Sequence, residues 1–327
     1  MNSTMLQSRL DAFDSYRSMQ EFGEVFIDAL PKHIKNLKIP GRVILQNQRR
    51  QPVMANVTHI ADIQDSMLEV LNHSITQEAQ RHAENAFKAF LQTDTVSSAV
   101  LKFFNGWNET HKTTSLVSAK IIMRLSADAM SVPAEKQIEY LNVMAHMHEV
   151  AKDDFGLGHP GHDGMYEYMT SAFAATAWVE SQYKVRECNE FSDFLYNTGI
   201  AEHKSALNSL EHKSSIMDAM MVSIASELWN GREYNFIAQY IEDKLLEVNP
   251  LLKNNVHALR NAKGYVMGHS GEVENKHGLH ALAAAQAYGR TMDLPFKLGR
   301  LKGIMLNYNE RVGRAFEAMY RNLNTEK

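Results

Sequence analysis

The sequence predicts an all-α protein, and three observations support this prediction. Apolar residues recur at intervals of three and four along most of the 327 residues, which is the spacing of one helix face. Only 7 prolines occur, and they fall between the periodic segments rather than inside them. No stretch shows the sustained alternation of a convincing strand ladder, and no internal repeat is found.

The N-terminal third is predicted to contain two long helical segments separated by a connector. Residues 1–30 have an amphipathic helical pattern. Residues 31–57 lose this period and carry three prolines, so we expect a connector, with a short strand around Arg42–Leu45. A helix is then predicted from Ile60 to Leu91, with an interruption near Ser74–Thr76.

The middle of the chain is predicted to contain four helices. Two are expected at Ser97–Trp107 and Thr113–Ala129, the second opened by a threonine and serine cluster suited to capping. Proline in the first turn marks the start of a third, at 134–154. After the glycine-rich turn 156–161, a fourth helix is predicted at His162–Tyr183.

The C-terminal part continues the helical pattern. Gly231, Pro250 and Pro295 mark gaps between further segments. The helices predicted here span residues 189–209, 212–230, 233–247, 253–290 and 296–322. We expect an N-terminal helical region, residues 1–110, and a larger bundle, residues 111–327, with the boundary near Asn105–Thr114.

Composition limits the classes of function. Hydrophobic content of 44% and charged content of 22% are ordinary for a soluble globular protein. A net charge of −4 without a long basic run argues against nucleic acid or an anionic membrane as partner. The single cysteine, Cys188, fits a reducing compartment. Since neither a signal peptide nor a membrane-length apolar run of ~18 residues is found, we expect a cytoplasmic protein.

The segment Tyr265–His280 has the highest density of side chains that bind metals. It contains three histidines and two glutamates, namely His269, His277, His280, Glu272 and Glu274. If the segment is helical, Glu274 and His277 lie three residues apart on one face. A carboxylate and an imidazole placed in this way form two ligands of one metal ion.

Other segments offer further ligands. Glu149 and Asp154 lie at the end of one predicted helix, and His162 opens the next, so the turn between them brings these side chains together if it folds back. Glu227 is an acid inside an apolar run, and a buried carboxylate requires a cation or a hydrogen-bond network. Solvated surface positions remain the alternative for each of these acids.

The mixture of histidine and carboxylate indicates the kind of metal. It favours iron, manganese or zinc over magnesium or calcium, which prefer shells of oxygen alone. No cysteine lies near these groups, which excludes a thiolate-rich zinc or iron–sulfur site. The sequence also lacks a phosphate-cradling glycine loop and a GxSxG elbow.

Together these segments resemble the haem-oxygenase-like diiron oxidases and oxygenases, which are helical proteins that bind two irons rather than haem. Residues Asn142–Phe173 resemble the first core helix of that family, with Asp154 in place of its carboxylate and His162 in place of its histidine. Glu227 resembles the lone glutamate of the second core helix. Glu274-x2-His277 matches the second half of the His-x3-Asp-x2-His pattern in the third.

The chain departs from the family pattern at two places. The first ligand of the family is normally a glutamate, so Glu149 is the alternative to Asp154. Four residues before Glu274 stands Ser270 rather than histidine, and His269 is one residue away. A one-residue bulge of the π type would bring His269 into register.

The resemblance implies a haem-oxygenase-like bundle over residues 110–325, preceded by an additional N-terminal helical region. It implies two non-haem iron ions, O2 as co-substrate and a biosynthetic oxidoreductase that acts on a small amine, an amino-acid-derived molecule or a fatty-acid-like molecule. N-oxygenation is preferred over desaturation and C–C cleavage, because the long N-terminal region resembles the N-oxygenating members. An external electron donor is compatible with it, and exposed apolar positions in the N-terminal helices favour a homodimer.

Two other interpretations remain open. One is a metal-free enzyme of the same helical shape, similar to a thiaminase or a cofactorless oxidase, and the off-register His269 is its main support. The other is a non-catalytic helical binding protein. A ferritin-like carboxylate oxygenase ranks lower, because only one Glu-x2-His pair has a promising context.

Overall fold

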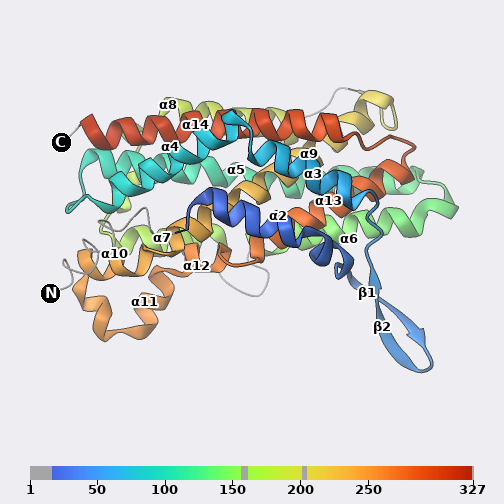
Figure 1. The fold of residues 1–327 in the computed structure, drawn as a ribbon, viewed down its shortest axis with the longest axis horizontal. Coiled ribbons are helices and arrows are strands. Elements are labelled where there is room, and N and C mark those ends of the chain that lie inside the picture. Colours follow the sequence, from blue (N-terminus) through green and yellow to red (C-terminus); the bar gives the residue numbers. More distant parts are fainter. Residues whose placement is uncertain (1–16, 156–160, 201–204, 326–327) are drawn as a thin grey trace.

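The computed structural model describes residues 17–155, 161–200 and 205–325, and it is helical apart from one two-stranded sheet. This confirms the predicted all-α class. The long helices run roughly parallel to one axis of the molecule, and the hairpin projects from the helical body (Figure 1). In the described ranges, no helix is both long enough and apolar enough to cross a membrane.

The helix α2 spans Met19–Lys35 and opens with a capping box between Ser18 and Glu21. Residues 1–16 of the predicted first helix lie outside the described residues. The prediction that Pro31 begins a connector is wrong, because Pro31 lies inside α2. Proline leaves the carbonyl of Ile27 without its helical partner, and the Gln64 side chain donates to this carbonyl at 2.9 Å. The long-range bond offsets the local defect.

The connector contains a complete β-hairpin rather than one short strand. Strands β1 (Lys38–Gln46) and β2 (Arg49–Met54) pair antiparallel. Asn47 and Gln48 have φ values of 50° and 64°, as a tight two-residue hairpin turn requires. The strands were underpredicted because β1 does not alternate buried and exposed side chains. Three consecutive apolar residues, 43–45, are all more than half exposed.

Helices α3 (Ile60–Leu71) and α4 (Ser74–Leu91) confirm the predicted interrupted segment. Helix α5 (Ser98–Asp128) is one continuous helix, so the prediction of two helices is wrong. The polar residues that suggested a break between two helices are instead largely buried, and they form hydrogen bonds there. Thr110 donates to the Trp107 carbonyl at 2.8 Å, for example. The boundary predicted between two regions falls within this helix.

Helix α6 (Gln137–Asp154) follows two 3-10 turns, Ala129–Ser131 and Ala134–Lys136, and agrees with its prediction. Helix α7 begins at His162 as predicted but ends at Ala172, and two 3-10 turns follow. Helix α8 (Arg186–Leu195) continues into a π-helical turn, Tyr196–Ile200. Most of the glycine-rich turn, residues 156–160, lies outside the described residues.

Helix α9 (Leu210–Ala238) runs through Gly231, so the predicted break there is wrong. A Cβ atom at Gly231 would collide with the Asn275 side chain, which shows that this glycine permits the close approach of another helix. Helix α10 (Ile241–Val248) and a 3-10 turn, Pro250–Asn254, follow it.

The predicted single helix over residues 253–290 is three helices. These are α11 (Val256–Ala262), α12 (Gly264–His269) and α13 (Val273–Thr291). Gly271 separates the last two, with φ of 75°. Helix α14 (Leu298–Thr325) ends the described chain.

Packing places α13 at the centre of the molecule. It packs along α9 and α6, while α5 contacts α6, α8, α9 and α14. The N-terminal helices cover this bundle, since α4 packs along α14 and α2 packs against α9 (Figure 1). The haem-oxygenase-like arrangement stays a prediction.

The contact between α4 and α14 gives a test of this packing. At Gly313 an added Cβ would lie 2.7 Å from the Ala79 Cβ, whereas the exposed Gly303 has no atom within 4 Å. We expect Gly313→Ala to lower the free energy of unfolding by about 1–3 kcal/mol through overpacking. Gly303→Ala should raise it by about 0.5–1 kcal/mol through helix propensity. Urea denaturation measures both free energies. If both substitutions changed the free energy of unfolding in the same direction, the close contact between α4 and α14 would be contradicted.

Candidate metal centre

Acidic and histidine side chains from five helices converge beside the break between α12 and α13. They come from the end of α6, the start of α7, the middle of α9, the end of α12 and the first turns of α13. The residues are Asp153, Asp154, His162, Glu227, His269, Glu274 and His277. Six of these seven were predicted from the sequence.

Three of these side chains form a tight buried group. The ligand atoms of Glu227, Glu274 and His277 all lie within 4.8 Å of one another. His277 Nδ1 is 3.6 Å from Glu227 Oε2 and 3.7 Å from Glu274 Oε2. The other ring nitrogen, Nε2, is 3.1 Å from Asp153 Oδ2. All three residues of the group are at least 95% buried, so bulk water does not screen their charges.

A second group contains His162, His269 and Asp154. The Nε2 atoms of the two histidines contact each other directly. His162 Nδ1 lies 3.3 Å from Asp154 Oδ1, and His269 Nδ1 bonds to the carbonyl oxygen of Tyr265. Each imidazole is therefore held at Nδ1 by a carboxylate or carbonyl, while its Nε2 points to the centre of the group. This is the usual arrangement of histidines that bind metal.

Glu274 connects the two groups. Its Oε2 faces His277, and its Oε1 lies 3.9 Å from His269 Nε2. Oε1 is buried and has no hydrogen-bond partner. The carboxylate thus has one oxygen directed toward each group, with one oxygen available for an additional ligand.

The break at Gly271 explains how His269 reaches the site. The π-type bulge predicted to correct its register is wrong. Helix α12 ends at His269, Ser270 is extended, and α13 begins at Val273, so the helical conformation is interrupted between them. The glycine in a left-handed conformation allows this interruption, so a serine at position 270 does not remove the histidine from the cluster.

The carboxyl groups differ in their expected protonation. Burial raises the pKa of Asp154 to about 8, and the negative charge of Glu274 adds to this effect. Burial also raises the pKa of Glu227 well above its ordinary value. Burial acts in the same direction on Glu274, but the hydrogen bond and the charge of His277 outweigh it, so its pKa is lowered.

The histidines respond to the same surroundings. Burial lowers the pKa of both His162 and His269, and their mutual contact lowers that of His162 further. At His277 burial also favours the neutral ring, but hydrogen bonds to Asp153 and two glutamates outweigh it and raise its pKa. Without a metal, these shifts favour an imidazolium at His277 and a carboxylate at Glu274, and they favour the neutral forms of Asp154, Glu227, His162 and His269.

Glu149, the alternative to Asp154, does not join this cluster. Its carboxylate is 2.5 Å from Lys152 Nζ and 3.5 Å from Lys276 Nζ, which lower its pKa despite burial. Asp154 reaches the cluster because it lies at the very end of α6, five residues further along. His280 also lies outside it, since its ring bonds to that of His146.

A group that supports the cluster was missed from the sequence. The carboxylate of Glu233 is fully buried and accepts from Trp107 Nε1 at 2.7 Å and Trp229 Nε1 at 2.6 Å. His111 Nε2 lies 3.2 Å from the same carboxylate, and its Nδ1 is 2.8 Å from the Trp107 carbonyl. Because both ring nitrogens face acceptors, His111 fits the charged form. Burial disfavours that form, but Glu233 outweighs burial and raises the pKa of His111.

The raised pKa of Glu227 predicts an unusual substitution effect. The raised pKa favours the protonated form of Glu227 in the metal-free protein, and glutamine resembles that neutral form. We therefore expect Glu227→Gln to change the free energy of unfolding by less than about 1 kcal/mol in the absence of metal. Urea denaturation after chelation measures this. A loss of about 3–5 kcal/mol would instead mean that a buried charge pair had been broken.

The described residues thus combine two linked groups of carboxyl and imidazole side chains, the types that bind metals, with a separate buried carboxylate at Glu233. Tyr265 and Tyr234 line the histidine side, where the Tyr234 ring stacks on His269 at 4.7 Å between centroids. Comparison with known proteins finds no matching family model, curated protein or solved structure.

Proposed function

We propose that this protein is a non-haem diiron oxidase or oxygenase that uses O2 to oxidise a small organic molecule. The observation that supports this most directly is the position of Glu274 between two groups, each with a histidine and another carboxylate. A carboxylate that bridges two metal ions, with further carboxylates and histidines from facing helices, is how helical bundles hold such pairs.

The chemistry of the donor set fits iron. His269 carries its proton on Nδ1, because this atom bonds to the Tyr265 carbonyl, so its Nε2 has a lone pair. The Asp154 carboxyl lies beside His162 Nδ1 at 3.3 Å, and His162 Nε2–H donates to that lone pair. A metal ion in place of the proton between the two Nε2 atoms would receive two imidazole ligands, and the buried Oδ2 of Asp154, which has no hydrogen-bond partner, would supply a carboxylate. Mixed nitrogen and oxygen donors of this kind suit iron, manganese or zinc.

Each side chain has a definite role in this proposal. Asp154, His162 and His269 would hold one iron, Glu227 and His277 the other, and Glu274 both. Bound iron would supply the electrons that reduce O2. Asp153 orients His277 through Nε2, which leaves Nδ1 directed at the two glutamates. The rings of Tyr234 and Tyr265 cover the histidine side and exclude water.

The substrate class rests on the resemblance of the sequence. We propose a small amine, an amino-acid-derived molecule or a fatty-acid-like molecule, with N-oxygenation as the first reaction to examine. An external electron donor would return the oxidised irons to the ferrous state.

Anaerobic loading with Fe(II) tests the proposal. After removal of free metal, we expect about two irons per chain and uptake of O2 by the ferrous protein. Binding at pH 7 should also release protons, because Asp154, Glu227 and the His277 imidazolium must each lose one to become ligands. Calorimetry in two buffers of different ionisation enthalpy measures this release independently of activity.

Three outcomes would contradict the proposal. A chain without stoichiometric iron cannot be a diiron protein. Binding of zinc together with ferrous protein inert to O2 would indicate a hydrolytic or structural site. Full activity after exhaustive chelation would support a metal-free proton-transfer enzyme instead.

A further inference from the structure

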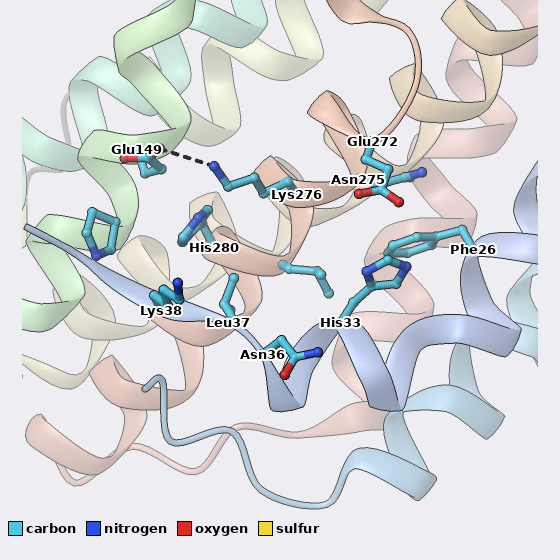
Figure 2. Close-up of a pocket in the computed structure, with 12 residues that line it drawn as sticks. Phe26, His33, Asn36, Leu37, Lys38, Glu149, Glu272, Asn275, Lys276 and His280 are labelled. Carbon is cyan, nitrogen blue, oxygen red and sulfur yellow. Dashed lines mark ion pairs between the residues drawn. The ribbon is translucent and has the colours of Figure 1, made fainter. Parts of the chain in front are cut away.

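A pocket lies against the face of α13 that points away from the candidate metal centre. It has a volume of about 330 Å³, at the lower end of the range for small-molecule sites, and lies between α2, β1, α6 and α13. Its residues on α13 include Lys276, Leu279 and His280. Their helical positions place them nearly opposite Glu274. Figure 2 shows Glu149, Lys276, His280 and Lys38 along one side of this pocket.

His280 contributes a polar atom that lacks a partner. The residue is 2% exposed and lines the pocket. Its Nδ1 lies 2.8 Å from Nδ1 of His146, so the two rings share one proton at this contact. Its other nitrogen, Nε2, is buried and makes no hydrogen bond. Such an atom is costly unless a bound group satisfies it.

Positive charge exceeds negative charge on this side of the pocket. Glu149 is shared by Lys152 at 2.5 Å and Lys276 at 3.5 Å, so one carboxylate faces two ammonium groups. Lys38 adds a third, and no acid in the described part of the chain forms an ion pair with it. The remaining acid of the lining, Glu272, is exposed and lies on the other side with Phe26 and His33 (Figure 2).

We propose that this pocket binds a small organic carboxylate, with its anionic end at Lys38, Lys276 and His280 Nε2. The carboxylate accepts from Nε2–H of His280, which completes the bonding of this buried atom. Apolar contacts come from Phe26, Leu37 and Leu279, which favours a carboxylate with a hydrophobic body over a bare inorganic ion.

The proposal fixes the tautomers of the two histidines. When His280 donates from Nε2, its Nδ1 is the acceptor, so His146 must carry its proton on Nδ1. Burial lowers the pKa of His146 to about 4, and burial together with the charges of His146 and Lys276 lowers that of His280. Both rings are therefore neutral at pH 7. Binding of the carboxylate is therefore coupled to the tautomers of His146 and His280.

Benzoate is a suitable probe, with benzamide as its neutral counterpart of similar shape. We expect metal-free protein to bind benzoate in calorimetry and to bind benzamide at least about tenfold more weakly. Nitrogen NMR of the histidine rings should show His280 fixed with its proton on Nε2 when benzoate is bound. Because neither measurement needs iron, failure here is distinct from failure of the diiron proposal.

Variants identify the pocket. Lys38→Met and His280→Phe should each weaken benzoate binding at least about tenfold. Lys32→Met is the matched control, since Lys32 is exposed on α2 and does not line the pocket. Circular dichroism verifies folding of each variant, and Lys38, being exposed, keeps the test valid if His280→Phe does not fold. Equal binding by Lys38→Met and wild type, no benzoate binding, or tighter binding of phosphate than benzoate would each overturn the proposal.

Discussion

Replacing Glu233 with alanine is expected to cause the largest loss of stability of any substitution described for this chain. The change removes one carboxylate but leaves two indole N–H groups and the His111 imidazolium without their buried acceptor. Each unsatisfied buried donor costs about 1–3 kcal/mol, so we expect a loss of about 3–6 kcal/mol in the free energy of unfolding. This is a large part of the total for a typical domain, about 5–15 kcal/mol.

Two further variants make the Glu233 result specific. Glutamine at position 233 keeps one acceptor oxygen, so Glu233→Gln should fall between wild type and Glu233→Ala in urea denaturation. Glu135→Ala removes an exposed glutamate and should change stability by no more than about 0.5 kcal/mol. If Glu233→Ala were as stable as this control, Glu233 would not be the buried acceptor for Trp107, Trp229 and His111.

Under the proposed diiron function, the Glu274→Gln variant is expected not to bind an iron pair, although it keeps its fold. This carboxylate has one oxygen facing each histidine group, so no other residue can replace it at both. Loss of an outer partner of a metal ligand already lowers affinity about 10–100-fold, and loss of the shared ligand should exceed this range. Iron content after anaerobic loading and desalting measures the effect, together with O2 uptake.

Glu167→Gln is a suitable comparison for Glu274→Gln. Glu167 is exposed on α7, one turn beyond the His162 end, and does not contribute to the cluster. This variant should load iron as wild type does. Full iron loading by Glu274→Gln would show that the carboxylate is not a shared ligand, and the two groups would then be separate.

Much of the candidate centre was predictable because its information is local. Glu274 and His277 share a helix face by their spacing alone. Glu227 was identified because a carboxylate within an apolar run needs a partner, and the structure buries it beside His277. Asp154 and His162 flank a turn, and their side chains meet across it at 3.3 Å.

Features that depend on long-range packing were not predictable from the sequence. Polar residues in the middle of α5 suggested a break between two helices. They instead contact polar partners in the core, as His111 contacts Glu233. Pro31 suggested the end of a helix. The helix continues because the Gln64 side chain, which is distant in the sequence, bonds to the Ile27 carbonyl that proline leaves without a partner. That Asp154 reaches the cluster, whereas its alternative Glu149 pairs with Lys276, likewise depends on how α6 meets α13.

The two tryptophans that share the Glu233 carboxylate also provide an intrinsic fluorescence signal. Of the three tryptophans in the chain, Trp107 and Trp229 are fully buried and both donate to this one group. Trp107 contacts Tyr265, which in turn contacts His269 of the candidate centre. Fluorescence from these indoles should be quenched as metal enters the site, so iron uptake can be followed in real time without a label.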